Sequence, residues 1–283
     1  MNFKRKALII LLTLLFALTT AALVTACEKE GGLTYSLSNG EQTITGYYGK
    51  ITDIEIPEEW EGYPVTAIGN AAFFDCNSLK SIKIPDCVTY IGYNSFNRCS
   101  RLESVTVGKN LEFIGDKVFQ DCTSLKTVYW NAIKCTDRGI LSNYPVFNGC
   151  SDLTTVIFGN EVQNIPAYMF SNFTPLKSIE VPDSVTSIGY RAFEGCTGLE
   201  SITFGENSLL TSIDDVAFYN CTGLKSIVLP DSITSIGSYA FLGCVNLTTV
   251  YYGGTQEQWK QISIGHENTC LTDATIHFKS SNN

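Results

Sequence analysis

The chain has 283 residues, of which 44% are hydrophobic, and its 28 Asp and Glu outnumber 19 Lys and Arg for a formal net charge of −9. Because the phosphates of nucleic acids and of anionic bilayers would meet like charge, electrostatic binding to either is excluded.

The N-terminus has the pattern of a secretory signal. Lys4, Arg5 and Lys6 precede an apolar run over residues 7–18, and small residues follow. This run of about a dozen residues is short for a membrane-spanning helix, which needs roughly 20. We therefore expect the chain to be exported.

The next segment, Val24-Thr25-Ala26-Cys27, resembles a bacterial lipobox. The resemblance implies that residues 1–26 are removed, that the Cys27 thiol carries a diacylglyceryl group as a membrane anchor, and that residues 27–32 form a short tether. The alternative is an ordinary signal peptide followed by a chance cysteine. Removal of three cations and no acids would leave a net charge of 16 − 28 = −12.

A repeat organises the rest of the chain. Phenylalanines recur at spacings of 23, 23, 28, 23, 23, 25 and 23 residues, and a leucine follows each of them by six residues. A cysteine follows by three residues in every unit except the fifth, where Phe173 takes its place. The phenylalanines are Phe73, Phe96, Phe119, Phe147, Phe170, Phe193, Phe218 and Phe241. Chance does not produce eight registered copies, so the period is a structural repeat.

One unit shows the local structure to expect. From Leu199 to Phe204, apolar residues alternate with polar ones, which predicts a short strand with one buried face. The irregular apolar spacing from Val185 to Cys196 favours a short extended piece and then a tight helical turn, with Gly189 allowing a bend. Strands often end at Pro-Asp turn signals.

A unit of 23 residues cannot bury both of its apolar edges alone, whereas stacked copies can. We therefore expect a β-rich solenoid in which each short strand pairs in parallel with its neighbours, joined by irregular or short helical turns. The pattern Val-Thr-x-Ile-Gly-x-x-Ala-Phe-x-x-Cys-x-x-Leu-x-x-Ile-x-Ile-Pro closely resembles the BspA-type leucine-rich repeat of bacterial surface proteins. The resemblance covers about residues 33–278.

The repeat pattern also divides the chain. Residues 33–64 are predicted to form an N-terminal cap, in which Ile51–Pro57 matches the strand half of a repeat lacking its first half. Eight repeats follow over 65–252, with an insertion near 129–146 that we expect to bulge. Residues 253–283 form the C-terminal cap and tail. Caps are needed because an open solenoid edge would pair with other molecules.

The repeat cysteines are interpreted as a buried ladder of inert thiols. Their parallel Cα–Cβ vectors are poor disulfide geometry, and a 23-residue spacing supplies no clustered metal ligands, so no metal site is expected. Cys87, Cys135 and Cys270 lie outside the ladder. Its members are Cys76, Cys99, Cys122, Cys150, Cys196, Cys221 and Cys244.

Catalytic residues are sparse. The two histidines, His266 and His277, both lie in the C-terminal cap, and nothing in the sequence places a nucleophile beside either. Glu58 and Glu59 are adjacent, as in a solvated turn, and no phosphate-binding glycine loop is present. We expect neither an enzyme nor a cofactor.

The outward strand positions form two columns. The first is uniform, with Ser or Thr in every repeat, and favours a role in stacking. The second varies in charge, size and polarity while the frame around it repeats, so ligand specificity could lie there; drift on an unliganded surface is the alternative. This variable column is Lys83, Thr106, Tyr129, Ile157, Glu180, Thr203, Val228 and Tyr251.

The function expected is non-catalytic binding at the bacterial cell envelope. The family resemblance implies protein or glycan partners and roles in adhesion, although a shared fold is a weak guide to function. Two alternatives stay open: a passive scaffold in an envelope complex, and a hydrolase that uses loop residues with His266 or His277. The oligomeric state and the ligand's identity do not follow from the sequence.

Overall fold

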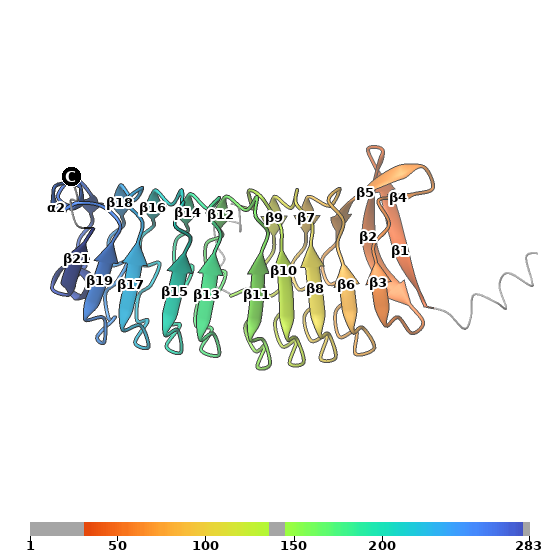
Figure 1. Ribbon diagram of the computed structural model, residues 1–283. Helices are drawn as coiled ribbons and strands as arrows, with labels where there is room; N and C mark the ends of the chain where they lie inside the picture. The colour runs from red at the N-terminus through yellow and green to blue at the C-terminus, as the bar shows by residue number, and fades with distance from the viewer. Residues whose placement is uncertain (1–30, 136–144, 280–283) are drawn as a thin grey trace, which may run out of the picture.

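The computed structural model describes residues 31–135 and 145–279, and it is a β-rich solenoid. Figure 1 shows the repeats stacked side by side in one row, with one strand of each repeat in a long front sheet. The front strands are β3 (Asp53–Glu55), β6 (Ser81–Lys83), β8 (Ser104–Val107), β10 (Thr127–Trp130), β11 (Thr155–Phe158), β13 (Ser178–Val181), β15 (Ser201–Phe204), β17 (Ser226–Leu229), β19 (Thr249–Tyr252) and β21 (Thr275–Phe278). The predicted fold class, with short parallel strands and little helix, is confirmed.

A second sheet joins the extended pieces that precede each phenylalanine. Most of its strands have two residues, with a buried isoleucine second, because each repeat needs only one apolar side chain here. These short strands are β7 (Tyr90–Ile91), β9 (Phe113–Ile114), β12 (Asn164–Ile165), β14 (Ser187–Ile188), β16 (Ser212–Ile213), β18 (Ser235–Ile236) and β20 (Ser263–Ile264).

The phenylalanines and cysteines of the repeat form a third line of contacts, the Phe–Cys column. The eight rings are fully buried and stack in sequence, from 4.9 Å between the centroids of Phe73 and Phe96 to 5.8 Å between those of Phe147 and Phe170. The seven ladder cysteines are buried beside them. This column is the centre of the core.

The turns that carry the column are not helical, contrary to the expectation for residues after Gly189. Arg191 and Gly195 have φ of +55° and +66°, and equivalent residues of other repeats also have positive φ. This conformation lets alternate N–H groups point along the stack: those of Arg191, Phe193 and Gly195 donate to carbonyls of the next repeat. An α-helical turn would direct those groups along its own axis instead.

The front sheet is not continuous, so the expectation that every strand pairs with its neighbours is wrong at two places. Hydrogen-bonded pairing is missing between β11 and β13 and between β15 and β17. Each break coincides with a departure from the repeat. Phe173 replaces a small cysteine at the first, and two extra residues separate β15 from β16 at the second. Both departures change the spacing that adjacent strands need to pair.

The short-strand sheet is interrupted between β9 and β12, in the repeat with the insertion. There Ile133 accepts a hydrogen bond from the Gln163 amide, which puts Cys135 in register with Ile165. Cys135, which the sequence pattern placed outside the cysteine ladder, therefore takes the place of a buried isoleucine. The extra residues follow it, and residues 136–144, where the bulge is expected, lie outside the described residues.

The N-terminal end is closed by antiparallel strands. β1 (Gly32–Ser38) pairs with β2 (Glu41–Tyr48), which runs parallel to β5 (Tyr63–Ile68), and β4 (Glu59–Trp60) pairs with β5. The cap segment Ile51–Pro57 does not lack its first half, because β2 supplies it: Ile44 pairs with Ile68, and Tyr47 stacks on Phe73. An antiparallel hairpin breaks the repeat pattern and covers the sheet edge.

The C-terminal end adds two one-turn helices, α2 (Gln256–Trp259) and α3 (Thr269–Thr272), to strands β20 and β21. Buried Asn268 completes the hydrogen bonding there. Its Oδ1 accepts from the Phe241 amide at 3.0 Å, and its Nδ2 donates to the carbonyls of Gly237 and Gly265. The last turn of the Phe–Cys column thus meets a side chain where a further repeat would stand.

Candidate functional site

The eight residues of the variable column lie in register along one face of the front sheet, apart from the two breaks. Strand pairing aligns Lys83 with Thr106 and Tyr129 with Ile157, and equivalent pairs follow in the later repeats. Thr106 is half-buried and the other seven are exposed. The cap strands extend the column by Glu55 and His277. The sequence signal for both was present, because each stands between two apolar residues of a cap strand.

Contacts within the column neutralise one of its charged residues and leave another uncompensated. The Lys83 ammonium donates to a Glu55 carboxylate oxygen at 2.5 Å, and this hydrogen bond raises the pKa of Lys83. At the other end the rings of Tyr251 and His277 stack at 5.1 Å. The carboxylate of Glu180 has no hydrogen bond or ion pair among the described residues. Lys83 is therefore neutralised within the chain, while Glu180 leaves an uncompensated charge on the face.

The uniform column of Ser and Thr lies beside the variable one, on the same face. Its hydroxyls were expected to pair between strands, but within the described residues no hydrogen bond joins two of them across strands. Ser81 instead donates to the Asp53 carboxylate at 2.6 Å. Small side chains here leave room around the variable column.

A cleft opens at the first break of the front sheet. It has a volume of about 260 Å³ and lies between β11 and β13. Two members of the variable column, Ile157 and Glu180, line it, as do Val156, Phe158, Asn160 and Pro182. The site therefore has depth at the point where its unpaired charge stands.

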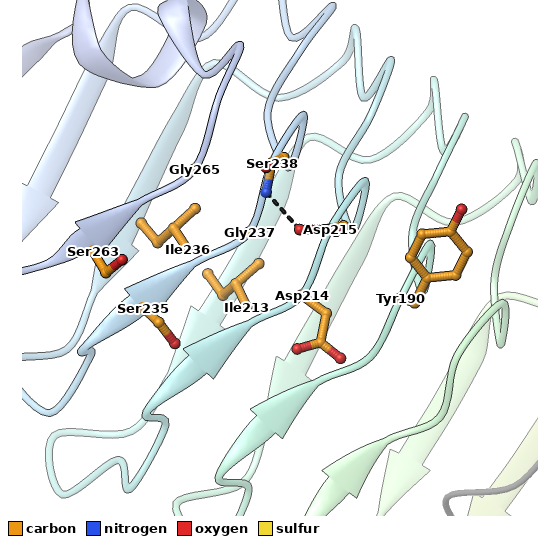
Figure 2. A pocket seen from close by; sticks show the side chains of 10 residues that line it. All are labelled: Tyr190, Ile213, Asp214, Asp215, Ser235, Ile236, Gly237, Ser238, Ser263 and Gly265. Carbon is orange, nitrogen blue, oxygen red and sulfur yellow. Dashed lines mark hydrogen bonds between the residues drawn. The ribbon is translucent and has the colours of Figure 1, made fainter.

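A second, shallower hollow lies over the short strands β16, β18 and β20. Figure 2 shows the Asp214 carboxylate between the Tyr190 ring on one side and Ser235 and Ser263 on the other. The volume of this hollow is about 490 Å³. At the rim, Asp215 accepts a hydrogen bond from the Ser238 amide at 2.6 Å. Sequence analysis did not single out these residues.

Asp214 occupies a position where most repeats have glycine. Its amide donates to Ile188, as the Gly237 amide donates to Ile213 one repeat later. Glycine suits the position because a Cβ on Gly237 would lie 2.3 Å from the Asp215 nitrogen. Partial burial, with a smaller effect of neighbouring Asp215, raises the pKa of Asp214. Because Asp214 replaces glycine, a carboxylate lines the hollow at a position where most repeats present only backbone.

The ladder thiols are hydrogen-bond donors as well as core side chains. Six of them donate to the carbonyl of the preceding repeat's phenylalanine at 3.0–3.1 Å, as Cys196 does to Phe170. Burial raises the pKa of Cys196 to about 12. None of the ten cysteines of the described ranges is in a disulfide, and Cys87 and Cys270 are half-buried. The thiol protons thus form hydrogen bonds between repeats. Burial favours the protonated, unreactive form of these thiols.

The two histidines lie on different parts of the C-terminal cap, His277 on the front face and His266 at the turn after β20. Neither imidazole has a hydrogen bond to a hydroxyl or thiol among residues 31–135 and 145–279. Across these ranges no three His, Cys, Asp or Glu side chains gather as metal ligands. Nor does any helix found there have the length and apolarity to cross a membrane.

Known structures share this architecture. The leucine-rich repeat protein TpLRR of T. pallidum is 24% identical, with 76% of this chain and 87% of that chain covered and a TM-score of 0.50, which shows the fold alone. A leucine-rich repeat protein of Bacteroides ovatus is 26% identical over 84% and 68%, with a TM-score of 0.49. A leucine-rich cell surface protein of Faecalibacterium prausnitzii is 23% identical over 83% and 97%, with a TM-score of 0.35.

No curated protein matches the chain. The family model of the BspA type leucine-rich repeat region matches residues 45–144 and 140–268, in six copies. The matched residues span more than half of the chain and carry the Phe, Cys and Leu positions that build the stack. The protein therefore belongs to the BspA type leucine-rich repeat family.

Proposed function

We propose that the protein is a non-catalytic binding protein of the bacterial cell envelope, and that its front face recognises another protein. One observation carries the proposal. Tyr129, Ile157, Val228 and Tyr251 are 43–47% exposed on a rigid strand face, although the fold needs none of them for its core. Exposed aromatic and aliphatic groups in one line are typical of interfaces, where Tyr is enriched among the energetically dominant residues.

The sequence supports a position close to the membrane. If Cys27 carries the lipid, β1 begins only five positions further along the chain, at Gly32, a reach of at most roughly 18 Å. In a thick-walled cell the stack would then lie under or within the wall. Partners within the envelope, or molecules that diffuse into it, therefore fit better than a distant host surface.

The test of the anchor is processing of the precursor. Cys27→Ala should leave the precursor uncleaved, and globomycin should make the native precursor accumulate. Native protein with no incorporated fatty acid and unchanged processing of the variant would remove the anchor from the proposal.

The test of the front face uses a protein and glycan array probed with residues 28–283, which hold every described element. Tyr129→Ala combined with Tyr251→Ala should weaken binding to the array ligand at least tenfold. The matched control combines Tyr63→Ala with Tyr239→Ala, which removes two rings of similar exposure, 41% and 43%, away from the variable column. Melting temperatures verify that both variants fold. Full binding by the folded Tyr129/Tyr251 variant would contradict the proposal.

A glycan ligand is a second candidate, and the hollow in Figure 2 favours it. Arg191 lies 5.2 Å from the Tyr190 ring centroid and donates to its hydroxyl at 2.8 Å, so the ring is held in place. A fixed ring beside a carboxylate and serine hydroxyls suits the apolar face and hydroxyls of a sugar. Asp214→Gly restores the usual repeat residue, so it should fold normally while losing any glycan signal. An unchanged glycan signal would exclude this hollow.

The passive-scaffold alternative predicts a different result. A scaffold would co-purify with other lipoproteins through surfaces outside the variable column, and the Tyr129/Tyr251 variant would then keep those partners. Loss of the partners in that variant would favour recognition by the front face.

A further inference from the structure

The break between β11 and β13 exposes backbone as well as side chains. The Thr155 amide donates to the Lys126 carbonyl just before β10, and the Gly159 amide donates to Trp130 at its end. The alternation of a parallel strand therefore turns the backbone of Val156 and Phe158 toward β13. Pairing of β13 with β15 likewise turns the backbone of Ser178 and Glu180 toward β11. No backbone hydrogen bond crosses the break in the described chain. Three of these residues, Val156, Phe158 and Glu180, line the cleft, and their backbone carbonyl and amide groups have no interstrand partner across the break in the described chain.

The same cleft has an apolar wall and one negative charge. Val156, Ile157 and Pro182 contribute aliphatic surface, and the Glu180 carboxylate, with no partner of its own, lies across from Ile157. The ammonium of Lys177, which directly precedes β13, lies 3.8 Å from a carboxylate oxygen of Glu200 and so is engaged elsewhere. An occupant with a positive charge and several N–H donors on an aliphatic stem would complement the carboxylate, the carbonyls and the apolar wall of this cleft.

We propose that the cleft binds an arginine side chain presented by the protein partner of the front face. A guanidinium carries five N–H donors in one plane, enough for the Glu180 carboxylate and the carbonyls that border the cleft. Its three methylenes would pack on Ile157 and Val156. Arginine fits better than lysine because it is more weakly hydrated and donates in several directions at once. This inference rests on the proposed function and names the chemistry of its partner.

The second break provides a comparison within the chain. Between β15 and β17 the backbone of Ile202, Phe204, Ser226 and Val228 lacks interstrand pairing too. The variable column there has Thr203 and Val228, without a carboxylate. The absence of strand pairing alone therefore does not create the proposed site. The site also requires the charge of Glu180 at an open cleft. Binding should therefore be confined to the first break.

The experiment titrates residues 28–283 with N-acetyl-arginine amide and follows backbone amide shifts by NMR. We expect saturable shifts at Val156, Phe158, Ser178 and Glu180. N-acetyl-citrulline amide, which keeps the shape and loses the charge, should bind at least tenfold more weakly. Glu180→Gln should weaken the arginine probe at least tenfold. Glu206→Gln, the same change at an exposed carboxylate without a partner in the described chain, should leave it unchanged.

Equal binding of the citrulline and arginine probes, shifts spread over other carboxylates, or unchanged affinity in Glu180→Gln would each overturn the inference. So would an array ligand that proves to be a neutral glycan bound at this cleft. The proposed function fails separately: it stands if the Tyr129/Tyr251 variant loses its array ligand even though the arginine probe does not bind. It falls if that variant keeps the ligand, whatever the probe does.

Discussion

The Phe–Cys column and the front sheet run along the same stack, but only the column is continuous. Every neighbouring pair of phenylalanine rings is stacked, with centroids 4.9–5.8 Å apart. The front sheet is in three pieces, and the short-strand sheet is interrupted between β9 and β12, next to the first break of the front sheet. Of these three lines of contacts, only the column joins all eight repeats, so its ring contacts continue where the sheets open.

This difference explains why the front face can vary. A strand position that contributes little to cohesion can exchange its outward residue, or lose its pairing, while the rings beneath remain in contact. The column has no such freedom, because a ring removed from it leaves a cavity between two others. Repeat proteins usually combine a rigid core with a variable face that forms the binding surface. Three changes test this division of roles.

The largest effect is expected from Phe193→Ala. The ring is fully buried between those of Phe170 and Phe218, so its loss should lower the free energy of unfolding by about 3–5 kcal/mol. Thr203→Ala, in the front sheet of the same repeat, should cost less than about 0.5 kcal/mol. Denaturant unfolding of residues 28–283 measures both. Similar costs for the two variants would mean that the column and the sheet share the cohesion equally.

Asn268→Ala tests whether the column needs its end closed. The change removes an acceptor for the Phe241 amide and a donor to two carbonyls, and unsatisfied buried groups should cost about 2–3 kcal/mol. Asn246 is an exposed residue whose Nδ2 donates to the Thr222 carbonyl. Asn246→Ala should therefore cost about 0.5 kcal/mol. Thermal melts of the two variants give the comparison, and equal shifts would argue against a capping role for Asn268.

The last effect appears only at alkaline pH. Because the pKa of buried Cys196 is raised to about 12, the folded chain keeps a proton that the unfolded chain releases above pH ~8.5. The stability that this thiol contributes is complete below that pH and is lost as the pH rises toward 12. The loss should be about 1.4 kcal/mol per pH unit.

Hydrogen bonds with neighbouring thiols, and then burial, also raise the pKa of Cys122 and Cys221, so the stack should weaken at these repeats too. Melting temperatures from pH 7 to 10.5 should fall less steeply for Cys196→Ala than for the native chain. Identical slopes would show that the Cys196 thiol ionises in the folded state without cost.

The arrangement of the core follows from the sequence alone. Phe, Cys and Leu recur at fixed offsets, and a period of 23 residues allows one solution, a stack in which equivalent side chains meet. The same pattern placed Tyr129, Ile157 and Val228 outward, because strand positions alternate between core and solvent. These inferences need only local spacing, and family membership confirms the repeat.

The tertiary structure decided what depends on distances between repeats. The spacing of residues in the sequence could not show that the front sheet opens beside Glu180. Pairing between two adjacent strands depends on the summed volumes of the buried side chains beneath them, including Phe173. Nor could the spacing show that Lys83 is paired with Glu55, or that Cys135 stands in for an isoleucine, because each partner lies 28 or more residues away in the chain. A repeat pattern determines what each unit contains, whereas contacts between unequal units are settled only when they are packed together.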